Sequence, residues 1–137
     1  MSSDRNRAYL AIYDCGIPHE DLSAELGILP TSSYAKGDLH HIQGGFERRR
    51  TESAWILDSP LDSSAHLDDH VSALLGVLEP RAAVFSRLVQ HSESLIKCVA
   101  HYADHSPGIH LSPTVVRRAA ALGIGFDFDL YFRGIRS

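Results

Sequence analysis

The tripeptide Leu-Gly-Ile occurs twice in this chain, at residues 26–28 and 122–124. Glycine is common just past the end of a helix because it adopts the left-handed backbone conformation without a steric penalty. Each copy follows an amphipathic pattern, which itself follows a short apolar run typical of a strand. The sequence therefore predicts two strand–helix–strand units.

The first unit begins with a predicted strand over residues 8–13, and its helix carries an apolar stripe at Leu22 and Leu26. In the second unit Ser112 is suited to cap the helix, because its hydroxyl can accept from a backbone N–H of the first turn. The last predicted strand, 124–132, alternates apolar and polar residues. That alternation indicates a sheet with one face packed on helices and the other partly polar.

Two further helical patterns, separated by Pro80, lie between these units. We therefore expect an α+β, ferredoxin-like fold, a duplicated βαβ with a helix pair inserted between its halves. Its four-stranded, largely antiparallel sheet would carry the helices on one face. The single domain would span 1–137, with its first half at 8–60, the helix pair at 64–92 and its second half at 94–132.

Residues 29–52 have no sustained hydrophobic period and contain Pro30 and three glycines. We interpret them as a long loop that can hide a short strand, and a loop of this length in a compact domain is usually functional or mobile. Lys36 and Asp38 flank a glycine in a predicted turn. Arg48 begins a run of three arginines, which either recognises a carboxylate or phosphate or is simply a solvated loop end.

Trp55 and Asp129 are further candidates for a binding surface. Trp55 is the only tryptophan, and it either anchors an interface or fills the core beneath the loop. Asp127 and Asp129 project from the same side of the last predicted strand. Such paired carboxylates either carry out acid–base chemistry or form a polar outer face.

His66 and His70 are the weak candidates for a metal site, because residues four apart on a helix can reach one ion. No third ligand accompanies them at a fixed spacing, and we favour the interpretation that they belong to a solvated, acidic helix start. Cys15 and Cys98 are too few for a disulfide framework or a four-cysteine zinc site. We expect no metal, no cofactor and no catalytic residue.

The 137 residues include 13 basic and 17 acidic side chains, for a formal charge of −4. Binding to a nucleic-acid duplex requires many cations to neutralise phosphates, so we expect no nucleic-acid partner. No apolar run approaches the roughly 18 residues of a membrane span, and the first residues lack the apolar region of a signal peptide. We expect a cytoplasmic protein with reduced thiols.

Several short motifs follow one another in a recognisable order. They are Leu26-Gly27-Ile28, Pro30-Thr31, Lys36-Gly37-Asp38, Trp55, Leu74-Leu75, Leu78-Glu79-Pro80, Pro107-Gly108-Ile109 and Asp129-Leu130-Tyr131. This ordered set resembles the bacterial domain of unknown function 4279 (DUF4279), from about residue 8 to residue 131. The resemblance implies a stand-alone bacterial domain without an established activity, so no catalytic residue is carried over from it.

We expect a non-catalytic binding module that holds a protein partner or a second copy of itself. Its binding surface would combine residues 30–52, the strand around Trp55 and the polar face of the sheet. One version is an immunity-type protein that neutralises another bacterial protein. The alternative is a binding protein for a small anionic molecule, or a minor enzyme. Its cleft, between the loop and the sheet, would be formed by Lys36, Asp38, Arg48 and Asp129.

Overall fold

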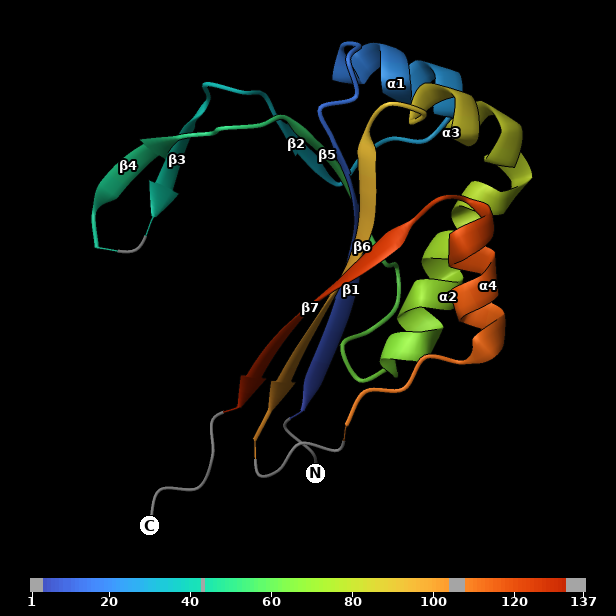
Figure 1. Cartoon of the computed structure of the whole chain (residues 1–137). Coiled ribbons are helices and arrows are strands. Elements are labelled where there is room, and N and C mark those ends of the chain that lie inside the picture. The colour runs from blue at the N-terminus through green and yellow to red at the C-terminus, as the bar shows by residue number, and fades with distance from the viewer. Residues whose placement is uncertain (1–3, 43, 104–107, 133–137) are drawn as a thin grey trace.

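The computed structural model describes residues 4–42, 44–103 and 108–132 (Figure 1). Its elements are β1 (Arg5–Tyr13), α1 (His19–Leu26), β2 (Ser32–Tyr34), β3 (Leu39–Ile42), β4 (Phe46–Arg49), β5 (Ala54–Asp58), α2 (Leu67–Leu78), η1 (Glu79–Arg81), α3 (Ala82–Leu88), β6 (Glu93–Tyr102), α4 (Pro113–Ala121) and β7 (Gly125–Phe132). The 3-10 turn η1 contains Pro80 and connects α2 to α3.

Five strands form one mixed sheet in the order β2-β5-β1-β6-β7, and β3 and β4 form a separate two-stranded sheet. Three neighbouring pairs of the large sheet are antiparallel, whereas β6 and β7 run parallel. Figure 1 shows the helices on one side of the large sheet and the β3–β4 hairpin extending on the other side. The helix layer therefore covers only one face of the sheet.

The core lies between this helix layer and the sheet. Leu10 of β1, Ile96 of β6 and Leu74 of α2 are fully buried and belong to one hydrophobic cluster. Trp55 of β5 is also fully buried, and its Nε1 donates a hydrogen bond to Ser23 Oγ of α1 at 2.9 Å. The tryptophan is thus a core residue with its polar atom satisfied, and it contributes to a binding surface only by supporting β5 from beneath.

The large sheet has five strands in place of the expected four, and the predicted halves 8–60 and 94–132 differ in how their strands are connected. Only the second half is a simple βαβ unit, because α4 connects β6 to its parallel neighbour β7. In the first half α1 leads to β2, which runs parallel to β1 with β5 inserted between them. A helical crossover returns the chain parallel, whereas β5 follows a hairpin and is therefore antiparallel to β1.

The segment predicted as a long loop over residues 29–52 contains the three short strands β2, β3 and β4. Together with β5 they form a bent hairpin, since β2 pairs with β5 and β3 with β4. At the bend Gly37 N donates to Arg50 O, and Arg50 N donates to Asp38 O, each at 2.8 Å. Neither β3 nor β4 has a buried face, so no hydrophobic alternation marks them in the sequence.

Candidate functional site

We call the sheet face opposite the helices the open face. Side chains alternate between the two faces along each strand, so the residues between the core positions point to this side. The open face is formed by Arg5, Arg7, Tyr9, Ala11, Tyr13, Ser32, Tyr34, Ala54, Ile56, Asp58, Glu93, Leu95, Lys97, Val99, His101, Asp127, Asp129 and Tyr131. It therefore collects tyrosines and charged groups from all five strands.

A row of polar side chains crosses the middle of the open face. Tyr9 on β1 lies opposite Asp58 on β5 and opposite Lys97 on β6. Lys97 in turn lies opposite Asp127 on β7, with Lys97 Nζ at 4.0 Å from Asp127 Oδ2. These four neighbouring strands thus place a lysine between a tyrosine and a carboxylate.

Lys97 also reaches toward Tyr13, whose ring centroid lies 5.7 Å from Nζ. The neighbouring Tyr13 side chain raises the pKa of Lys97 most, and Tyr9 and Asp127 act in the same direction, while burial opposes them. Only 25% of the lysine side chain is exposed. The ammonium group is therefore charged, partly shielded from water and held among aromatic side chains.

Tyr34 completes what we call the Tyr–Lys cluster, defined as Tyr9, Tyr13, Tyr34 and Lys97. Tyr34 on β2 lies in the same cross-strand row as Tyr13, with Ala54 between them. Burial raises the pKa of both Tyr9 and Tyr34 above the ordinary value of 10.0. Both hydroxyl groups therefore stay protonated at neutral pH and can donate hydrogen bonds.

Two arginines lie over tyrosine rings of this cluster. The guanidinium carbon of Arg50 is 3.9 Å from the ring centroid of Tyr34, and that of Arg7 is 5.0 Å from the ring centroid of Tyr9. A cation over an aromatic face is attracted by the ring quadrupole. Such stacking orders both side chains and leaves a mixed aromatic and cationic surface.

Of the four residues predicted to surround one cleft, Lys36, Asp38 and Arg48 lie on the bent hairpin, and Asp129 lies apart from them. Asp38 fixes the turn before β3, because its Oδ2 accepts a hydrogen bond from Ala35 N at 2.8 Å. Lys36 is exposed in the same turn, and Arg48 is exposed on β4. Asp129 is on β7, at the opposite edge of the large sheet from β2, with three strands between them. The structure therefore forms no common cleft from them.

The histidine pair on α2 has two unlike members. His70 is 1% exposed, and its Nδ1 lies 2.7 Å from Ser59 Oγ, whereas His66 is exposed at the start of the helix. Burial lowers the pKa of His70, which favours the neutral ring. Among the residues that the structure describes, no group of three or more His, Cys, Asp or Glu side chains is placed to hold a metal ion.

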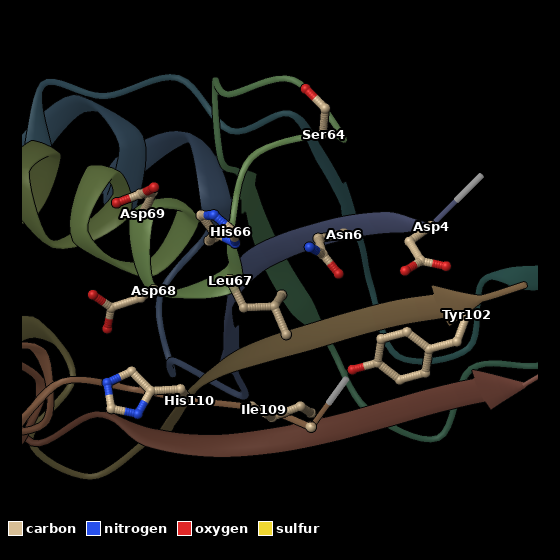
Figure 2. Close-up of a pocket in the computed structure, with 11 residues that line it drawn as sticks. Asp4, Asn6, Ser64, His66, Leu67, Asp68, Asp69, Tyr102, Ile109 and His110 are labelled. Carbon is tan, nitrogen blue, oxygen red and sulfur yellow. The ribbon is translucent and has the colours of Figure 1, made fainter. Parts of the chain in front are cut away.

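A pocket of about 730 Å³ lies where β1, β6, the start of α2 and the segment before α4 meet (Figure 2). It is lined by Asp4, Asn6, Ser64, His66, Leu67, Asp68, Asp69, Tyr102, Gly108, Ile109 and His110. Asp68 Oδ1 accepts from Ser112 N at 2.7 Å, and Asn6 Nδ2 donates to Ala65 O at 3.0 Å. These two hydrogen bonds connect neighbouring elements of the fold, so Asn6 and Asp68 have a structural role at this pocket.

The sequence pattern alone does not single out the Tyr–Lys cluster. A signal for it exists, because Tyr9 and Tyr13 alternate with the core residues Leu10 and Ile12, and Lys97 interrupts an apolar strand. Alternation shows that these side chains share a face within each strand. It does not show that β1 and β6 are neighbours, and this pairing is what brings Lys97 to the tyrosines.

The family model described as "Domain of unknown function (DUF4279)" matches residues 4–133 of the 137. No curated protein and no solved structure matches the chain. Within the described ranges, no helix is long and apolar enough to cross a membrane. Cys15 and Cys98 are both free, and burial raises the pKa of the Cys98 thiol to about 12, so that thiol is not a nucleophile at neutral pH.

Proposed function

The chain belongs to the DUF4279 family of domains of unknown function, and we propose that it is a cytoplasmic bacterial binding module. In this proposal the module has no catalytic role and holds a protein partner on its open face. The observation that supports it most is the Tyr–Lys cluster at the middle of that face. None of the described helices covers the cluster, because they lie on the opposite side of the sheet (Figure 1).

The residue types of the open face favour a protein partner. Tyrosine and arginine are enriched among the residues that dominate protein–protein binding energies, because they combine apolar area with hydrogen-bonding groups. Tyr9 and Tyr34 each lie beneath an arginine, which holds the rings in place before binding. The cluster extends over a sheet face and lies outside the 730 Å³ pocket, as expected for a surface that meets another surface.

The donors of the cluster indicate the chemistry of the partner. Lys97 Nζ is 4.0 Å from Asp127 Oδ2, which is longer than a hydrogen bond, so this carboxylate does not saturate the ammonium group. The protonated hydroxyl groups of Tyr9 and Tyr34 add further donors. We infer that the partner places hydrogen-bond acceptors over Lys97, from a carboxylate side chain or from backbone carbonyl groups.

The β3–β4 hairpin supports a second contact with the same partner. It extends from the sheet on the side opposite the helices (Figure 1). Phe46 is 68% exposed, Leu39 is 54% exposed, and the neighbouring Arg48 is exposed as well. Phe46 and Arg48 share one face of this ribbon and Leu39 lies on the other, so each face offers an exposed apolar side chain to a partner.

Other ligand classes have less support. Asp58, Asp127 and Asp129 share the open face with the cations, and these carboxylates would repel a phosphate backbone. The alternative of a small anionic ligand depends on Lys36, Asp38, Arg48 and Asp129, and the fold separates Asp129 from the other three. A protein partner can match interspersed charges of both signs, so the mixed surface favours that class.

The test is an affinity capture from cells of the source organism, with captured proteins identified by mass spectrometry. The bait is the full chain, compared with Lys97→Glu and Tyr13→Ala on the open face. Arg117→Glu is the matched control, because it makes the same change of charge at an exposed position on α4. We expect a protein that wild type and Arg117→Glu retain and that both open-face variants lose.

Thermal unfolding of each variant checks that all baits are folded. A partner that binds Lys97→Glu and Tyr13→Ala as well as wild type would show that the open face is not the binding surface. If no protein is captured, but a small molecule from the same cells binds in a way that depends on Lys97, the proposed partner class is wrong.

A further inference from the structure

Strand β7 lies at the edge of the large sheet, and within the described part of the chain its only neighbouring strand is β6. An edge strand presents a row of N–H and C=O groups that can pair with another strand. β7 has eight residues, which is long for an edge strand without a bulge or proline to protect it. This edge is therefore open to strand addition.

Three large apolar side chains of β7 are exposed to solvent. Phe128, Leu130 and Phe132 are 45%, 52% and 57% exposed. They lie opposite the core residues Cys98, Ala100 and Tyr102 of β6, so they point to the helix side of the sheet. Three large apolar side chains in a row at a sheet edge are typical of an interaction surface.

A second copy of the chain can cover this edge by adding its own β7 in antiparallel orientation. A two-fold axis perpendicular to the sheet keeps helix-side residues opposite helix-side residues. The two-fold axis must therefore pass through one residue of β7, which then lies opposite its own copy. An axis between two residues would place helix-side residues opposite open-face residues, because side chains alternate along a strand. Four centres allow at least five residues of β7 to pair with the second copy, namely Asp127, Phe128, Asp129 and Leu130.

The two aspartates of β7 discriminate among these centres. Centring on Phe128 would place Asp127 opposite Asp129, and centring on Asp127 or Asp129 would place that aspartate opposite its own copy. Like charges directly opposite each other destabilise a strand pair. Centring on Leu130 instead places Asp129 opposite Tyr131, whose hydroxyl group can donate to a carboxylate. It also places Phe128 opposite Phe132, so apolar side chains face each other.

We propose that this protein forms a homodimer in which the two β7 strands pair antiparallel, centred on Leu130. The pairing joins both five-stranded sheets into one continuous sheet, with both helix layers on the same side. The two open faces then adjoin each other. This inference depends on β7 alone and is independent of the Tyr–Lys cluster, so either proposal can fail without the other.

The first test is sedimentation equilibrium of the full chain from micromolar to submillimolar concentration. We expect a reversible dimer whose dissociation constant rises at least about tenfold in Leu130→Lys, because two ammonium groups would meet at the axis of an apolar contact. Val77→Lys is the matched control, since Val77 is an exposed aliphatic residue on α2. A wild-type chain that stays monomeric throughout, or a dimer that Leu130→Lys leaves unchanged, overturns the inference.

The second test determines the register by oxidative cross-linking of single cysteine variants. Directly opposite residues in an antiparallel pair lie within the Cα separation that a disulfide requires. Leu130→Cys is therefore expected to form a covalent dimer rapidly. Asp129→Cys and the wild-type chain are not expected to do so, and all three proteins keep the native Cys15 and Cys98. Rapid cross-linking of Asp129→Cys in place of Leu130→Cys would show that the proposed register is wrong.

Discussion

Replacement of Lys97 by methionine should abolish binding of the partner while lowering the free energy of unfolding only slightly. The ammonium group contributes a long ion pair with Asp127, whose side chain is 55% exposed, and such screened pairs contribute about 0.2–1 kcal/mol. Its contact with the Tyr13 ring, whose centroid lies 5.7 Å from Nζ, adds about 0.5–1 kcal/mol. Methionine keeps most of the aliphatic stem, and it removes the cost of partly burying a charge. We expect a net loss of about 1 kcal/mol in the free energy of unfolding.

Urea denaturation followed by tryptophan fluorescence measures this loss directly, because Trp55 is the only tryptophan and is fully buried. A change of about 1 kcal/mol corresponds to a fall of roughly 3–5 °C in Tm for a domain of this size. The same Lys97→Met protein should no longer capture the partner.

A loss of about 3 kcal/mol or more would refute the reasoning, since it equals the cost of removing a core side chain. Lys97 would then be a structural residue, and its failure to bind a partner would carry no information about the open face. Full partner binding by a stable Lys97→Met protein would refute the functional part alone.

Three further predictions concern stability. Trp55→Ala should lower the free energy of unfolding by about 3–5 kcal/mol in a urea titration followed by circular dichroism, and a loss below 1 kcal/mol would contradict its core position. Ser94 Oγ is buried without a hydrogen-bond partner among the described residues, so Ser94→Ala should raise that free energy by about 1 kcal/mol, and a loss would indicate an unseen partner. Burial lowers the pKa of His70 in the folded protein below its ordinary value of 6.5. The stability that depends on the neutral ring is therefore complete above pH 6.5, and it is lost as the pH falls from 6.5 toward the lower pKa of the folded protein. Titration by NMR should place the pKa of His70 below 6.5, and a value above 6.5 would contradict this account.

The helices could be predicted from the sequence because the residues that mark them lie close together in the chain. Ser112 was expected to cap a helix, and its Oγ accepts a hydrogen bond from Val115 N at the start of α4. Gly27 follows the last helical residue of α1 with a φ of 69°, a left-handed value that favours glycine. Both signals depend on residues within one or two turns, so tertiary contacts do not alter them.

The hairpin within residues 29–52 could not be predicted in the same way. His40 lies opposite Arg48 and His41 opposite Glu47, so polar side chains occupy both faces of this ribbon. Strand patterns are recognised by a buried face, and here backbone hydrogen bonds alone define the pairing. The sequence accordingly resembles a loop although the chain is extended and paired.

By itself the sequence determined which segments are helices and which long strands have two unlike faces, because spacing and capping act over a few residues. It also determined the DUF4279 family, through motifs that retain their order. Only the tertiary structure decided which strands are neighbours, and therefore that Tyr9 and Lys97, far apart in the chain, share a row on the open face. The physical reason is that strand order follows from how the whole chain buries its apolar surface, and no local pattern records that choice.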